Sequence, residues 1–212
     1  FGTAIINSLQ TTFGSLFVSL VVGICAAYII ARRRFRFGLK KPMTYWVLLV
    51  RVLPPVAFTI PLYIMFNKLG ILNTKLPVLL ACVLINVPLI IWFLISFFQD
   101  LPEEVEESAK VDGATEWQLF CRIVLPLVSP GIVATAIYVF INAWNEYLYS
   151  MILMSSSDKT TISVAVKTLE GADILNWGAL MAACAIVGVP SIIFFCFIQN
   201  KMAGGLSDGS VK

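Results

Sequence analysis

The segment EEVEESAKVDGATEWQLFCRIVLPL, residues 103–127, contains six carboxylates and lies between two long apolar runs. The chain as a whole is very different, because 59% of its 212 residues are hydrophobic and 13% are charged. Soluble domains hold about a quarter of charged residues. A bilayer span takes about 20 mostly apolar residues, and runs of this length occur on both sides of the segment. The sequence therefore predicts an all-α, polytopic membrane helical bundle that is interrupted by a charged helical segment.

The apolar runs predict five membrane spans, joined by four connections and followed by a short tail. The predicted spans are about 4–31, 43–66, 76–98, 128–153 and 177–199. The membrane domain thus covers residues 1–200, and residues 201–212 form the tail. Residues 99–127 form a connection far longer than the few residues that a turn between two helices needs.

The distribution of lysine and arginine predicts which connections face the cytoplasm. Six of them lie between Arg32 and Lys41, and four more lie in residues 99–127 and the tail. The two opposite connections together hold four, which are Lys68, Lys75, Lys159 and Lys167. Cytoplasmic loops are the ones enriched in these residues, so segment 99–127 and the tail should be cytoplasmic. Phe1 would then lie outside, and we expect a sixth span upstream.

Within the charged segment, local signals predict two short helices joined by a glycine turn. Pro102 suits a helix start, and the glutamates after it favour the positive end of the helix dipole. Gly113 suits a left-handed residue at a helix C-terminus. Thr115 and Gln118 form a capping box for the second helix. A solvated loop with helical content is the alternative, but the small and apolar side chains of the segment favour a docked element.

The same segment resembles the EAA loop of ABC-transporter permeases. That loop has Glu-Ala-Ala, three residues, Gly, nine residues and then Ile-x-Leu-Pro. Here Ser108 replaces the first Ala and every spacing agrees. The resemblance implies that the following residues couple the permease to an ATPase: Glu107, Ser108, Ala109, Asp112, Gly113, Ile123, Leu125 and Pro126.

Further stretches, among them 27-AYIIARRRFRFG and 144-WNEYL, are similar to the carbohydrate-uptake branch of these permeases, the MalG-like subunits. The resemblance covers nearly the whole chain. It implies a MetI-like permease of the type I importers, which translocates a sugar or oligosaccharide by alternating access. The implied partners are a second permease subunit, two ATP-binding subunits that hold ATP and Mg, and an extracytoplasmic sugar-binding protein. No cofactor is expected on this chain.

A polar stripe on the fourth predicted span is a candidate translocation path. Thr135, Tyr138, Asn142, Asn145, Glu146 and Tyr149 recur at spacings of three and four residues. Hydrogen bonding between helices of the bundle is the alternative role. Arg51 is a second candidate, because ionisable groups at membrane depth are costly and usually functional. The prolines at positions 54, 55, 61 and 88 fit either hinges or packing features.

The chain lacks the residues that several other functions need. It contains no histidine, and it has no GxxxxGK[ST] motif for ATP. Its five cysteines form no CxxC pair, and we expect buried thiols and no metal site. The basic residues gather at a predicted membrane edge, where the positive-inside rule explains them. They therefore do not indicate nucleic-acid binding.

Two other functions remain to be compared with an ABC permease. A secondary transporter would need intramembrane carboxylates for ion coupling, and Glu146 is the one candidate in the predicted spans. It would also leave the charged segment unexplained. A membrane enzyme acting on lipid-linked substrates is disfavoured by the lack of histidine and of an aspartate cluster.

Overall fold

The structure is a computed structural model, and it describes residues 1–32, 45, 47, 49, 52–170 and 177–207. The regular elements within these ranges are all helical. In chain order they are α1 (Gly2–Arg32), η1 (Pro55–Phe58), α3 (Thr59–Lys68), α4 (Lys75–Gln99), α5 (Glu103–Val111), α6 (Glu116–Leu119), η2 (Phe120–Val124), α7 (Leu125–Leu127), α8 (Ser129–Trp144), α9 (Leu148–Leu153), α10 (Ile162–Glu170) and α11 (Trp177–Ser207).

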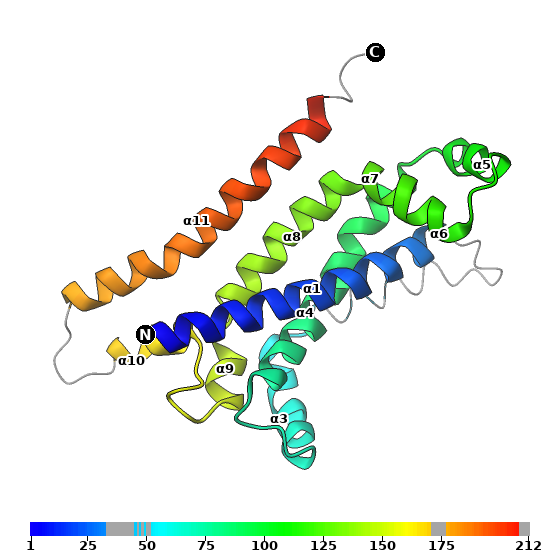
Figure 1. Ribbon diagram of the computed structural model, residues 1–212. Helices are drawn as coiled ribbons and strands as arrows, with labels where there is room; N and C mark the ends of the chain where they lie inside the picture. Colours follow the sequence, from blue (N-terminus) through cyan, green and yellow to red (C-terminus); the bar gives the residue numbers. More distant parts are fainter. Residues whose placement is uncertain (33–44, 46, 48, 50–51, 171–176, 208–212) are drawn as a thin grey trace.

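The centre of the molecule is a bundle in which α1, α4 and α8 pack on one another (Figure 1). Small residues allow the helices to approach closely. A Cβ built on Gly23 of α1 would lie 2.5 Å from Cγ2 of Ile90 in α4, and one on Gly131 of α8 would lie 2.6 Å from the ring of Phe97. Close approach through glycine is a common way for helices to associate in lipid, where apolar side chains gain little by leaving the solvent.

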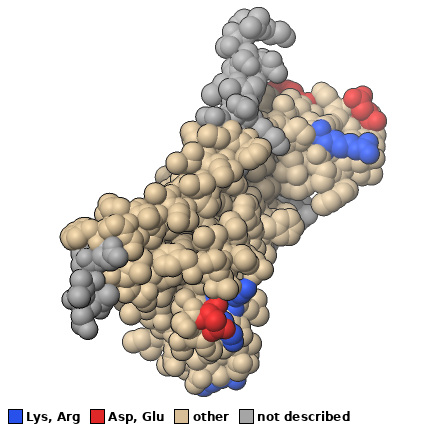
Figure 2. Space-filling model, turned by 60° about the vertical axis from the view of Figure 1, so that its left-hand side comes forward, with Lys and Arg blue, Asp and Glu red and all other residues tan. Residues whose placement is uncertain are grey.

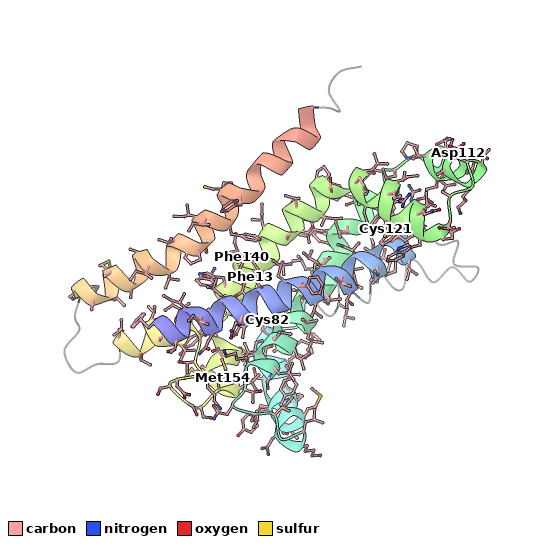
Figure 3. All side chains as sticks on the ribbon, viewed as in Figure 1. Phe13, Cys82, Asp112, Cys121, Phe140 and Met154 are labelled. Carbon is pink, nitrogen blue, oxygen red and sulfur yellow. The ribbon has the colours of Figure 1, made fainter. Side chains whose placement is uncertain are left out.

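α11 packs along α8 through aromatic rings. Phe140 of α8 stacks on Phe194 of α11 with ring centroids 3.9 Å apart, and Phe13 of α1 lies 5.6 Å from Phe140 (Figure 3). The indole N–H of Trp144 donates to the carbonyl of Val187 at 3.1 Å. These contacts tie three helices together at one level of the bundle.

The short elements gather at the two ends of the bundle. At one end, α5 and α6 project beyond the last turn of α1 (Figure 1). At the other end lie α3, α9 and α10, where the Asn7 amide donates to the carbonyls of Asp158 and Thr160. Figure 2 shows the charged side chains of one face at these two ends, with uncharged residues between them. Residues 99–127 and 154–170 therefore lie at opposite ends of the bundle.

Three of the described helices are long and apolar enough to cross a membrane: Gly2–Arg32, Lys75–Gln99 and Trp177–Phe197. Glu116–Leu127 and Ser129–Trp144 pass the same test together, but they are bent by 73°. The described residues thus contain up to four candidate spans, where the sequence predicted five. Part of the second predicted span, 43–66, lies outside the described residues.

Two of the predicted ranges are interrupted. In range 43–66, Leu53 and Pro54 lie outside any helix, and η1 begins at Pro55. Proline has no N–H to donate, and it disfavours helical backbone in the residue before it. In range 128–153 the first helix ends at Trp144, and three residues separate it from α9, which starts at Leu148. For range 128–153 the sequence predicted one continuous helix, whereas Pro54 and Pro55 already indicated a break in range 43–66.

Candidate functional site

The first candidate region is the projecting helix pair, which we define as α5, α6 and the turn between them. α5 ends in a Schellman motif, in which the N–H of Gly113 donates to the Lys110 carbonyl and that of Ala114 donates to the Ala109 carbonyl. Gly113 has a φ of 82°, a left-handed backbone conformation that favours glycine. Both features agree with the turn predicted from the sequence.

α6 begins with the capping box that the sequence predicts. The Thr115 hydroxyl accepts the backbone N–H of Gln118 at 3.3 Å, and the Gln118 side chain accepts the backbone N–H of Thr115 at 2.9 Å. Lys110 and Glu116 form an ion pair of 3.0 Å across the turn. The two helices are therefore joined by a turn whose hydrogen bonds are made locally.

The exposed surface of the projecting helix pair mixes acidic with apolar groups. Val111 is 87% exposed and Trp117 is 72% exposed, although both side chains are apolar. Glu107, Ser108 and Asp112 are exposed beside them, and Asp112 lies at the tip of the element (Figure 3). An exposed face of this composition is typical of a protein interaction site.

The opposite face of α5 is anchored to the membrane bundle. Ala109 is 6% exposed and belongs to the main hydrophobic core. Arg32, the last residue of α1, pairs with Glu106 at 2.9 Å, and its guanidinium also donates to the carbonyl of Leu101 at 2.6 Å. Both side chains of this pair are largely buried. The anchored face therefore links α5 to α1 and to the end of α4.

The structure separates the predicted coupling residues into two groups. Glu107, Ser108, Asp112 and Gly113 are exposed on the projecting helix pair. Ala109 faces the core, and Ile123 and Leu125 are half-buried in η2 and α7. Pro126 is exposed where the chain turns toward α8. Ser108 and Ala109, neighbours in the predicted motif, thus lie on different sides of α5.

The second candidate region is a cavity of about 580 Å³ at the break between α8 and α9. Its wall is formed by α4, by the Leu53–Phe58 stretch and by the break itself. The lining residues are Leu53, Pro55, Val56, Phe58, Cys82, Leu84, Ile85, Asn86, Pro88, Asn142, Asn145, Glu146, Tyr147, Leu148 and Tyr149. Its size lies within the range of small-molecule sites.

The polar residues at the break terminate one helix and start the next. The Asn145 amide donates to the carbonyl of Ile141 at 2.8 Å. The Glu146 carboxylate accepts the backbone N–H groups of Tyr149 at 2.6 Å and Ser150 at 3.0 Å. These are N–H groups in the first turn of α9, which have no partner within the helix. The Tyr149 hydroxyl donates to the Pro55 carbonyl at 2.7 Å, so the break also contacts the broken second segment.

The single polar stripe predicted through residues 135–149 is therefore divided. Thr135 is buried and donates to the carbonyl of Gly131 in its own helix. Tyr138 lies beside Phe93, with ring centroids 6.2 Å apart, and does not line the cavity. The structure brings together Asn142, Asn145, Glu146 and Tyr149. Arg51 lies outside the described residues.

Asn86 of α4 is a cavity residue that no pattern in the sequence indicated. It is 2% exposed, and its side-chain oxygen has no hydrogen-bond partner among the described residues. It is one polar residue inside the apolar run 76–98, so it contributes to no periodic pattern. Pro88, two residues later, interrupts the helical hydrogen bonds and is the signal that could have indicated a polar site near Asn86.

Comparison with known proteins gives one family for almost the whole chain. Residues 19–206 match the family described as binding-protein-dependent transport system inner membrane component. The chain is 32% identical to the diacetylchitobiose uptake system permease protein NgcG of Streptomyces coelicolor, covering 100% of this chain and 70% of that protein. It is also 32% identical to the trehalose transport system permease protein SugB of Mycobacterium tuberculosis, covering 100% of this chain and 77% of that protein.

Solved structures of ABC transporters have the same fold. A bacterial ABC transporter involved in alginate import aligns with a TM-score of 0.73 and 23% identity, over 94% of this chain and 74% of that chain. The MetNI methionine ABC transporter, in an inward-facing conformation, aligns with a TM-score of 0.78 and 14% identity, over 95% of this chain and 94% of that chain. The helical architecture and the family match thus agree, and this multi-pass chain belongs to the inner membrane components of binding-protein-dependent transport systems.

Proposed function

We propose that the chain is the membrane-spanning permease subunit of an ATP-driven sugar importer. The observation that supports this most directly is the 32% identity, over the full chain, to permease proteins named for diacetylchitobiose uptake and trehalose transport. The substrate would be a sugar or an oligosaccharide, moved by alternating access. The chain would lie in the cytoplasmic membrane of a bacterium or an archaeon.

The projecting helix pair is the proposed docking site for the ATPase. The chain has no phosphate-binding loop, so ATP and Mg would be held by separate subunits. The exposed face around Glu107, Ser108, Val111 and Asp112 would enter a groove on one of them. Arg32 and Glu106 would then transmit movement of α5 to α1, because their ion pair joins the two helices. Two ATP-binding subunits, a second permease subunit and an extracytoplasmic sugar-binding protein complete the proposed assembly.

The proposed translocation path runs past the cavity at the α8–α9 break. Amide, carboxylate and tyrosine groups supply hydrogen-bond donors and acceptors there, and the apolar lining suits the ring faces of a sugar. In a membrane, irregular backbone is tolerated where it is buried in protein or lines a water-filled cavity. Asn142, Asn145, Glu146 and Tyr149 are the residues proposed for the path at the cavity, and Tyr138 and Arg51 are proposed for the path from the sequence.

Uptake by the reconstituted complex tests the proposed function. The permease would be co-purified with the subunits encoded beside it and placed in liposomes, with the binding protein added. We expect ATP inside the liposomes to drive uptake of at least one of glucose, maltose, trehalose and diacetylchitobiose. Uptake driven by a proton gradient without ATP would instead identify a secondary transporter. Failure to transport any of these sugars with ATP would contradict a sugar importer.

A further inference from the structure

Asn86 occupies an unusual position for an amide. It lies in the middle of α4, eleven residues from one end of a 25-residue helix, at membrane depth. Its side chain is 2% exposed, and its oxygen has no hydrogen-bond partner in the part of the chain that the structure describes. Leaving such a group unpaired in a protein interior is costly, and native structures contain few of them. The amide therefore needs an explanation other than packing.

The side chain of Asn86 shares a face of α4 with Cys82, because residues four apart lie above one another on a helix. Cys82 packs in the same cluster as Ala143 of α8 and Tyr149 of α9. Asn86 and Cys82 also both line the cavity. The amide is thus directed toward the α8–α9 break and not toward lipid.

Three interruptions of helical backbone meet around this cavity. Pro88 in α4 has no N–H to give to the carbonyl of Leu84, and both residues line the cavity. Leu53 and Pro55 contribute the break in the second segment, and residues 145–147 contribute the break between α8 and α9. Broken helices at the level of the membrane core commonly surround a polar ligand.

Several other polar groups that line the cavity already make hydrogen bonds within the protein. Both carboxylate oxygens of Glu146 accept backbone N–H groups, and the amide of Asn145 donates within α8. Among the described residues, no group of three or more acidic or cysteine side chains could hold a metal ion. Asn142 is exposed and makes no hydrogen bond within the described part of the chain. Asn86 and Asn142 thus offer neutral amides to a ligand in the cavity, and amides suit hydroxyl groups.

We propose that this chain contains its own sugar subsite, enclosed by α4, the Leu53–Phe58 stretch and the α8–α9 break, and that Asn86 determines which sugar hydroxyl it accepts. The Asn86 oxygen accepts a hydrogen bond from a hydroxyl of the passing sugar, and Asn142 provides a second amide on the opposite wall. A ligand that lacks this hydroxyl leaves the buried amide unpaired, which disfavours it. This inference rests on the proposed function and adds the residue that selects the substrate.

The decisive variant is Asn86→Leu, which keeps a similar volume and removes the hydrogen-bonding atoms. If Asn86 only packs, removing an unpaired buried amide should leave folding unharmed and transport unchanged. If it binds the sugar, the KM for uptake of the transported sugar should rise about three- to tenfold in the reconstituted complex, while ATP hydrolysis without sugar stays at the level of the unmodified complex. The same change at an exposed asparagine of α3, Asn67→Leu, is the matched control and should leave KM unaltered.

Monodeoxy analogues of the transported sugar give the sharper readout. One analogue should be taken up equally by the unmodified complex and by Asn86→Leu, because it lacks the hydroxyl that the amide binds. Asn86→Gln moves the amide by one methylene and should alter the order of preference among the analogues. It is the variant to use if Asn86→Leu does not assemble into the complex. An unchanged KM and unchanged preference in both variants would overturn the subsite, while the proposed function would stand. Absence of ATP-driven sugar uptake in the unmodified complex would overturn both.

Discussion

At the residue scale, Gly113 is a position where backbone conformation alone restricts the side chain. A Cβ at this residue would meet no atom within 4 Å, so its φ of 82° is the remaining constraint. We expect Gly113→Val to weaken the Schellman turn by about 1–2 kcal/mol, because a branched side chain disfavours left-handed backbone. In the assembled transporter this should lower the amount of sugar moved per ATP hydrolysed.

Gly113→Asn is the matched control, because asparagine tolerates the left-handed conformation. It should retain most of the transport of the unmodified protein, and both variants should reach the membrane in equal amounts. If valine and asparagine behave alike, the backbone of this turn is not what matters for coupling. Transport assays on membranes with equal amounts of permease would decide this.

Gly23 tests the packing of α1 on α4. Gly23→Ala places a methyl group 2.5 Å from Cγ2 of Ile90 and 2.7 Å from its Cβ, so the two helices must separate. We expect the purified complex to lose about 1–3 kcal/mol of stability, measured by its thermal unfolding. Gly188→Ala in α11 is the control, because a Cβ there meets nothing within 4 Å. Equal unfolding temperatures for the two variants would contradict the packing described here.

At the element scale, the ion pair between Arg32 and Glu106 joins a membrane helix to the projecting helix pair. Removing one partner of a largely buried pair leaves the other charge without compensation. We expect Arg32→Met to cost about 1–3 kcal/mol and to reduce transport per ATP hydrolysed. The exchanged pair, Arg32→Glu with Glu106→Arg, should recover part of the loss.

The exposed ion pair between Lys110 and Glu116 provides the comparison for this prediction. Their side chains are 50% and 76% exposed, and surface pairs contribute about 0–1 kcal/mol. Lys110→Met should therefore change stability and coupling little. A larger effect of Lys110→Met than of Arg32→Met would argue against transmission through α1. ATP hydrolysis and uptake measured on the same preparation would provide both quantities.

The elements that could be predicted from the sequence are those set by local signals. The turn at Gly113 and the capping box at Thr115 depend on residues close together in the chain. The local sequence pattern was therefore enough to predict both. The α8–α9 break could not be predicted in the same way, because polar residues at spacings of three and four fit a continuous helix equally well. What ends α8 is a set of side-chain contacts, including Glu146 with the start of α9 and Tyr149 with Pro55.

The same reasoning explains why the candidate cavity was only partly predicted. Asn142, Asn145, Glu146 and Tyr149 belong to a repeating pattern and were found. Asn86 is isolated in sequence, and its importance appears when α4 is placed against α8 and α9. Tyr138 has the correct helical spacing but lies beside Phe93, away from the cavity.

At the scale of the whole molecule, the two candidate regions lie in different parts of one connected bundle. The projecting helix pair lies at one end, and α8, which leads from α7 to the cavity, crosses the interior between them (Figure 1). α1 contacts α4 and α8 along this length and is joined to α5 by Arg32. Movement of the projecting helix pair can therefore reach the cavity through packed helices, without a flexible linker in between.

The central claim is that the exposed face of the projecting helix pair docks on an ATP-binding subunit. A photo-reactive amino acid at Val111, which is 87% exposed, tests it directly in membranes that contain the whole transporter. Illumination should yield a covalent product between this chain and the ATP-binding subunit. The same amino acid at Phe17, which is 70% exposed within the span α1, should not yield that product. A transporting complex in which position 111 gives no product with the ATP-binding subunit would contradict the account.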